Sequence, residues 1–162
     1  LAAFSGVLAD VGIEVAQAVL ATWDDGAALQ AFVVRAVPAP DGRELQARFE
    51  ASLGRPLCSP PVGDAEVSFD GAPSPLYTPC RVRAADRPGL LHSIAVAIAV
   101  AGGDVHAARV VTAGGMARDD FDVSDRDGHK LVAADRAAIR AAIIEGVGAR
   151  RSGRRPAVGP RR

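Results

Sequence analysis

The sequence has few cysteines and no long apolar run, and both absences narrow the class of protein. Its 162 residues include two cysteines, Cys58 and Cys80, without a CxxC pair or neighbouring histidines. Isolated thiols of this kind are typical of a reduced, cytoplasmic protein, and we expect both to be buried or half-buried. No window approaches the roughly 20 apolar residues that a membrane-spanning helix needs, so we expect no membrane segment.

Net charge is also lacking, because 19 basic residues balance 19 acidic ones. The overall charge therefore predicts no nucleic-acid partner. Six arginines and no acid lie in the last 13 positions. We expect this Arg-rich tail to be a solvated, disordered end, with a weak contact to nucleic acid or to an acidic surface as the alternative. The first residue is Leu1 and no signal-peptide pattern follows, so we expect the chain to be cut out of a longer protein.

Catalytic signatures are missing as well. Phosphate-loop and Rossmann glycine spacings are absent, and the Ser, Cys and His residues show no arrangement that favours covalent catalysis. The run 125–128 has part of a calcium loop's spacing, but Val123 and Ala134 stand where acidic ligands are needed. A turn explains this run better. We therefore expect no enzymatic activity in this chain, no metal and no cofactor.

One pattern occurs twice in the chain. The two copies are 90 residues apart in their first part and, after a deletion of one residue, 89 residues apart in their second part. The first set of matches is Leu1, Ala9, Gly12, Val15, Ala18 and Thr22 with Leu91, Ala99, Gly102, Val105, Ala108 and Thr112. The second set is Gly26, Ala28, Phe32 and Val34 with Gly115, Ala117, Phe121 and Val123. The matches keep one order and need few gaps, which indicates an internal duplication.

Apolar spacing in the first copy predicts helices where it repeats at three and four residues, and strands where β-branched residues lie between turn signals. The expected elements are a helix over 1–11 ended by Gly12, strands over 13–22 and 28–37 joined at Asp24–Gly26, a helix from Asp41 to Leu53 with Leu45, Phe49 and Leu53 buried, and a closing strand over 62–69. The opening strand of this copy is missing, because Leu1 aligns with Leu91.

The second copy predicts strand, helix, two strands and a helix, at 78–84, 88–101, 104–112, 116–124 and 132–145. This order is the split βαβ arrangement, an α+β fold with an antiparallel sheet and helices on one face. We expect two ferredoxin-like (βαββαβ) repeats, at 1–70 and 78–147, separated by a linker at 71–77 and followed by a tail at 148–162. The second copy lacks an evident closing strand but should be the better-folded half.

The candidate binding site is the connection from strand to helix in the second copy. Its residues are Asp86, Arg87, Pro88, Gly89, Leu90 and Leu91. The N–H groups of Gly89, Leu90 and Leu91 at a helix start can bind a carboxylate. Asp86 and Asp104 can bind an ammonium group if the two connections lie at one end of the sheet. A helix cap for Asp86, and an ordinary turn residue for Asp104, are the alternatives.

These residues resemble a known regulatory module. The run 86–91, the step Gly102–Val105 and the run 121–123 resemble the ACT domain, which binds amino acids. Two copies in tandem resemble the C-terminal region of the bacterial bifunctional uridylyltransferase/uridylyl-removing enzyme, whose family modifies the PII nitrogen-signalling protein and senses glutamine. The resemblance covers roughly residues 1–145. It implies a ligand site at Asp86–Leu91 with Asp104 and Val105.

The resemblance further implies partners and a role in nitrogen signalling. The partners would be a small amino acid such as glutamine, the other ACT repeat, the catalytic domains of the parent enzyme and the PII protein. Two alternatives stay open. One is a ligand-free dimerisation module, and the other is an ACT segment of a different amino-acid-regulated enzyme.

Overall fold

A computed structural model describes residues 1–23, 27–35, 38–71 and 74–148. The expected turn at Asp24–Gly26, positions 72 and 73 of the expected linker and the Arg-rich tail from residue 149 lie outside the described residues. The elements are α1 (Ala2–Asp10), β1 (Glu14–Thr22), β2 (Ala28–Arg35), α2 (Gly42–Ser52), β3 (Glu66–Ser68), β4 (Thr78–Ala85), α3 (Leu90–Val100), β5 (Asp104–Ala113), β6 (Met116–Ser124) and α4 (Ala133–Glu145).

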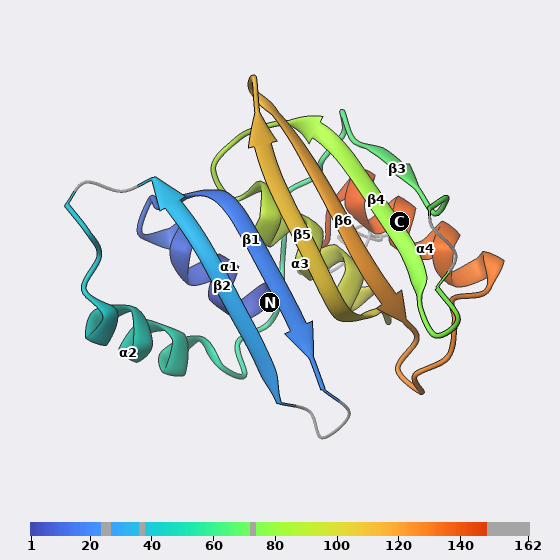
Figure 1. The fold of residues 1–162 in the computed structure, drawn as a ribbon, viewed down its shortest axis with the longest axis horizontal. Helices are drawn as coiled ribbons and strands as arrows, with labels where there is room; N and C mark the ends of the chain where they lie inside the picture. Colours follow the sequence, from blue (N-terminus) through green and yellow to red (C-terminus); the bar gives the residue numbers. More distant parts are fainter. Residues whose placement is uncertain (24–26, 36–37, 72–73, 149–162) are drawn as a thin grey trace, which may run out of the picture.

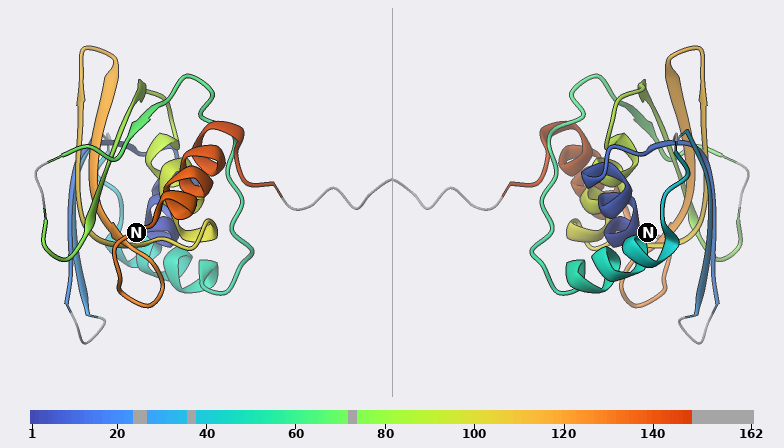
Figure 2. Two further views of the ribbon diagram at one scale, coloured as in Figure 1. Left: turned by 90° about the vertical axis from the view of Figure 1, so that its right-hand side faces the viewer. Right: turned by 90° about the vertical axis from the view of Figure 1, so that its left-hand side faces the viewer.

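The strands form one six-stranded sheet in the order β2-β1-β5-β6-β4-β3, with antiparallel pairing between neighbours (Figure 1). The helices lie on one face of this sheet, and the two side views show the other face free of helices (Figure 2). The expected α+β class with two ferredoxin-like repeats is confirmed. The two copies share this sheet rather than forming two separate ones.

The contact between the copies runs through β1 and β5 and through the helices behind them. Gln17 to Ala21 of β1 pair with Val111 to Ala107 of β5. Behind the sheet, α1 and α3 approach closely at Gly6, where an added Cβ would lie 2.8 Å from a ring carbon of His92. His92 Nδ1 also lies 2.9 Å from the carbonyl oxygen of Ala2. His92 is therefore a half-buried residue of the contact between the two helices.

The segment expected to close the first copy lies elsewhere. Only Glu66–Ser68 of the range 62–69 forms a strand, and this strand, β3, pairs with β4 at the far edge of the sheet. It thereby supplies the closing strand that the second copy lacks in sequence. The loop before it is fastened to α4, since the Val62 N–H donates to the Ile143 carbonyl and Ser59 exchanges hydrogen bonds with Val147.

The core lies mainly in the second repeat. The largest fully buried apolar side chains there are Phe121, Ile94, Ile98, Ile139, Ile143, Val82, Val96 and Val123. In contrast, α2 has no buried residue, and Leu53 is 58% exposed. The predicted buried stripe on this helix is therefore wrong. Leu45 and Phe49 are half-buried, and α2 contacts α1 through the rings of Phe49 and Phe4, whose centroids are 5.8 Å apart.

Two further expectations concern thiols and membranes. Cys80 is buried, and burial raises the pKa of its thiol to about 12. Cys58 is exposed, contrary to expectation.

Within the part of the chain that the structure describes, no helix is long and apolar enough to cross a bilayer.

Candidate functional site

The loop after β4 turns the chain sharply into α3. Gly89 is the residue before the helix and has a φ of +75°, a left-handed conformation that glycine adopts without steric cost. The helix therefore begins at Leu90, not at Pro88 as the sequence suggested. Asp86 does not cap it, and the Asp86 N–H instead donates to the Gly115 carbonyl across the β5–β6 turn.

Not all of the expected amide donors are available. The Leu90 N–H donates to the carbonyl of Arg87 at 3.1 Å, so it is already used within the loop. Leu91 and His92 lie in the first turn of α3, where amide groups have no acceptor four residues earlier in the helix. These amides carry the positive end of the helix dipole. The anion-binding potential of the loop therefore rests on the first turn after Gly89.

A cavity of about 120 Å³ lies where this loop meets the first repeat. The second repeat contributes the loop residues 86–91, His92, Ala117 and Asp119. The first repeat contributes Ser5 and Ala9 from α1, together with Ile13, Glu14 and Val15 at the start of β1. A single water needs only about 10–15 Å³ of such space, so the cavity has room for a small metabolite.

Asp104 and Val105 do not join this site. Along β6, Met116 pairs with Ala85 at the end of β4, whereas Ser124 pairs with Asp104 at the start of β5. The two ends are opposite, because β4 and β5 run parallel and α3 carries the chain back along the sheet between them. The condition for Asp86 and Asp104 to bind one ammonium group, that both lie at one end of the sheet, is therefore not met.

The duplication explains which residues stand at the cavity instead. Glu14 and Val15 occupy the positions of the first repeat that match Asp104 and Val105 of the second. Because β1 is antiparallel to β5, the start of β1 lies at the end of the sheet where β4 finishes. Asp104 lies at the other end, near the amino group of Leu1, whose pKa is lowered by burial and raised to a smaller degree by Asp104.

The remaining loop residues have mixed roles. The Arg87 guanidinium donates to Asp64 at 2.8 Å, and this hydrogen bond lowers the pKa of the Asp64 carboxyl. Arg87 is thus engaged with the segment before β3. Pro88 is exposed, and Leu90 and Leu91 are buried in the core. Of the loop's side chains, Asp86 is the exposed acid that lines the cavity.

Asp119 is the cavity residue that the sequence analysis missed. It is 1% exposed, and its Oδ1 atom has no hydrogen-bond partner among the described residues. Burial, and to a smaller degree the charges of the neighbouring Asp86 and Asp120, raise the pKa of its carboxyl to about 7. The alternation of residues along β6 could have identified it. Every second residue of this strand faces the core, and Asp119 lies in this row with Ala117, Phe121 and Val123.

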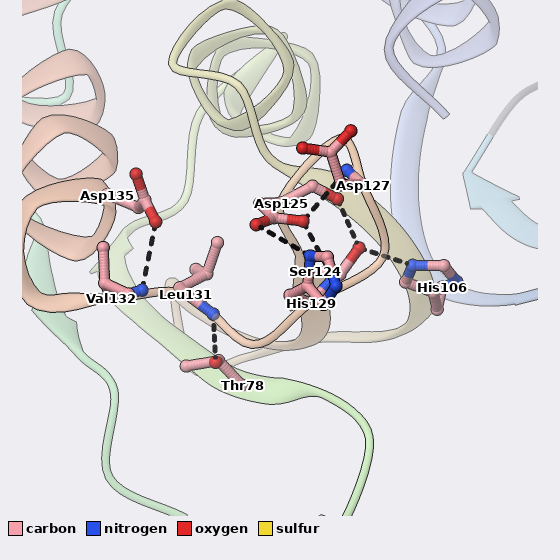
Figure 3. A network of polar contacts seen from close by, with 9 residues as sticks. All are labelled: Thr78, His106, Ser124, Asp125, Asp127, His129, Leu131, Val132 and Asp135. Carbon is pink, nitrogen blue, oxygen red and sulfur yellow. Dashed lines mark hydrogen bonds and ion pairs between the residues drawn. The ribbon is translucent and has the colours of Figure 1, made fainter.

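A second polar cluster lies at the opposite end of the sheet (Figure 3). His106 stacks on Tyr77, and its Nε2 atom lies 2.8 Å from Ser124 Oγ. Asp125 Oδ1 accepts the N–H groups of Asp127 and His129. The side chains of Asp125, Asp127 and His129 bring three potential metal-ligand atoms within 4.8 Å of one another. The carboxylate of Asp125 already organises the turn, as predicted for 125–128.

Three curated proteins that are similar to part of this chain have the same description. A bifunctional uridylyltransferase/uridylyl-removing enzyme of Methylococcus capsulatus is 38% identical over 84 residues, and one of a Bradyrhizobium species is 40% identical over 82 residues. A third, from Bradyrhizobium diazoefficiens, is 37% identical over 90 residues. These matches cover 50–55% of this chain and 9–10% of each relative. The resemblance to this enzyme is confirmed over about half of the chain, which spans about a tenth of the relatives' length.

Two further comparisons give no information about the fold or the function of this chain. No protein-family model matches the chain. A solved structure described as an unknown protein from Galdieria sulphuraria covers 75% of this chain and 71% of its own, with 18% identity and a TM-score of 0.26. A likeness this distant supports no conclusion about fold or function.

Proposed function

We propose that this chain, related over about half its length to the bifunctional uridylyltransferase/uridylyl-removing enzyme, is an amino-acid-sensing regulatory segment of such an enzyme. Glutamine is the ligand we propose first. The partners would be the catalytic domains of the parent enzyme and, through them, the PII protein. No catalytic role is proposed for the chain itself.

The observation that carries this proposal is the cavity of about 120 Å³ between the two repeats. It combines a helix start, where free amide groups favour an anion, with acidic side chains, which favour a cation. An α-amino acid presents both groups on neighbouring atoms. Glu14 from β1 and Asp86 from the loop line the same cavity, so one ligand would touch both repeats.

Contact with both repeats suggests how binding could be transmitted. A ligand that binds one packing of the repeats more tightly than another shifts the population toward the first. Coupling energies of about 1–3 kcal/mol are typical of such regulation. The α1–α3 contact lies directly behind the cavity, because His92 both lines the cavity and packs on Gly6. We propose that this contact responds to the ligand.

The test is calorimetric titration of the chain with glutamine, using wild type and two matched variants. Gly89 and Gly128 have φ values of +75° and +82°, and no atom lies within 3.4 Å of a Cβ added at either. Gly89→Val and Gly128→Val therefore carry similar backbone strain, about 1–2 kcal/mol or more for a branched side chain. We expect the Gly89 variant to lose at least tenfold in affinity and the Gly128 variant to bind like wild type.

One rival function has its own support. The continuous β1–β5 pairing already joins the two repeats of this chain without any ligand, as expected of a ligand-free interaction module. This rival predicts no heat of binding from glutamine or any other amino acid. Equal binding by the Gly89 and Gly128 variants would instead contradict the proposed position of the site.

A further inference from the structure

Asp119 is a buried acid to which no residue that the structure describes supplies a counter-ion. Its strand partners are Val82 on β4 and Val110 on β5, both apolar. Arg87, the arginine of the cavity lining, is engaged with Asp64 at 2.8 Å, and Arg81 of β4 is engaged with Asp120 at 2.6 Å. Among the ion pairs that the described residues form, none includes Asp119.

Leaving a carboxyl group in this state is costly. A buried polar atom without a hydrogen bond destabilises a fold by about 1–3 kcal/mol, and an unpaired charge by more. Such groups are rare in native proteins and call for an explanation, for example a partner that binds from outside. The carboxyl lies on the wall of the cavity beside the start of α3, so a bound molecule can reach it.

The charges around the cavity favour a cation next to Asp119. The acids that line it are Glu14 from β1, Asp86 from the loop and Asp119 from β6. Arg87 and His92 are the basic residues of the lining, and Arg87 is paired with Asp64. Arg118 and Asp120 flank Asp119 on β6 but are exposed, because successive strand residues face opposite sides.

We propose that Asp119 binds the α-ammonium group of the ligand, so that the cavity accepts α-amino acids and rejects the same molecules without the amine. The ligand's carboxylate would lie toward the first-turn amides of α3 and its ammonium toward β6. This assignment rests on the proposed function and defines its chemical class more narrowly. It replaces the part that sequence reasoning gave to Asp104.

Ionisation of Asp119 adds a second signature. With its pKa raised to about 7, the carboxyl is partly protonated near neutral pH in the free protein. A bound ammonium favours the carboxylate and lowers this pKa. Binding at pH 7 therefore releases part of a proton, and the affinity rises as the pH increases through 7. Below that pH the affinity falls, because the ligand must displace the proton.

The experiment compares glutamine with glutaramic acid, the analogue that lacks the α-amine, by calorimetry at pH 7 in two buffers of different ionisation enthalpy. The variants are Asp119→Asn, which keeps the shape and removes the charge, and Asp122→Asn, which changes an acid on the opposite face of β6. We expect wild type and the Asp122 variant to bind glutamine with proton release and to bind glutaramic acid at least tenfold more weakly. The Asp119 variant should lose at least tenfold in affinity and show no proton release.

The outcomes separate this assignment from the function it rests on. If wild type binds glutamine, but Asp119→Asn binds within twofold of it or glutaramic acid binds equally well, the role of Asp119 is refuted and the sensing function stands. If wild type binds no amino acid, both are refuted. Proton release by the wild-type protein is measured without any variant, so a folding defect in Asp119→Asn would not rescue the assignment.

Discussion

At the scale of single residues, Asp119 is exceptional because it is an acid at a position of the core that favours an apolar side chain. Every other member of its inward-facing row on β6 is apolar, and its Oδ1 lacks a partner among the described residues. Asp119 lies on the same strand as Asp120 and Asp122, whose side chains face outward. Strand alternation would have separated them, but only if β6 had been placed in register with Phe121 and Val123 facing the core.

The raised pKa of Asp119 makes the stability of the free protein depend on pH. The carboxyl is protonated up to about pH 7 in the folded chain but only up to about 3.8 in the unfolded chain. The folded state therefore binds more protons between these values, and the free energy of unfolding falls as the pH rises from 4 to 7. At about 1.4 kcal/mol per pKa unit, the fall is on the order of 2–4 kcal/mol.

The measurement is denaturant unfolding between pH 4 and 8 of wild type, Asp119→Asn and Asp122→Asn. We expect the Asp119 variant to lose this pH dependence and to be more stable than wild type at pH 8. The Asp122 variant should keep the wild-type slope. A wild-type slope in Asp119→Asn would mean that the carboxyl is ionised normally in the folded protein.

At the scale of elements, the packing of α1 on α3 links the two repeats behind the sheet. Gly6 permits this approach, because an added Cβ would lie 2.8 and 2.9 Å from two atoms of the His92 ring. The same ring forms the hydrogen bond with Ala2. The sequence predicted a helix over 88–101, but it could not show which helix lies against the first turn of that helix.

The Gly6–His92 contact predicts a change of sign in a mutant cycle. In wild type, Gly6→Ala should destabilise the fold by about 1–2 kcal/mol, because the ring must move and overpacking costs more than a better helix former returns. In a His92→Ala background the obstacle is gone. Gly6→Ala should then stabilise the chain by up to about 1 kcal/mol, since alanine favours helix over glycine. Denaturant unfolding of the four proteins measures the cycle, and additive effects would contradict this contact.

The pairing of β3 could not be predicted from the sequence, whereas the position of Asp104 could. β3 was expected to close the first repeat, yet it pairs with β4 of the second. Its residues fit either place, because both edges offer an antiparallel strand and no local signal distinguishes them. The position of Asp104 was instead deducible, since two parallel strands joined by a helix begin at the same end of a sheet. The end of β4 and the start of β5 must then lie far apart.

At the scale of the whole molecule, the duplication gives one sheet with two unequal halves. The α+β class, the order of elements and the helix ends at Gly12 and Asp41 followed from apolar spacing and capping residues. The shared sheet did not, because the β1–β5 pairing joins residues about 90 positions apart. The same pairing brings Glu14 to the loop of the other repeat, so the site exists only in the joined arrangement.

The central claim is that an amino acid binds between the repeats, at the end of the sheet where β4 finishes. Two-dimensional amide NMR of the chain during titration with glutamine tests it directly, because each amide reports its own surroundings. We predict the largest shifts at Gly89, Leu91 and His92 of the second repeat and at Ile13–Val15 of the first, with Asp104 and Val105 unchanged. Shifts centred on Asp104, or no shifts with any amino acid, would contradict the claim.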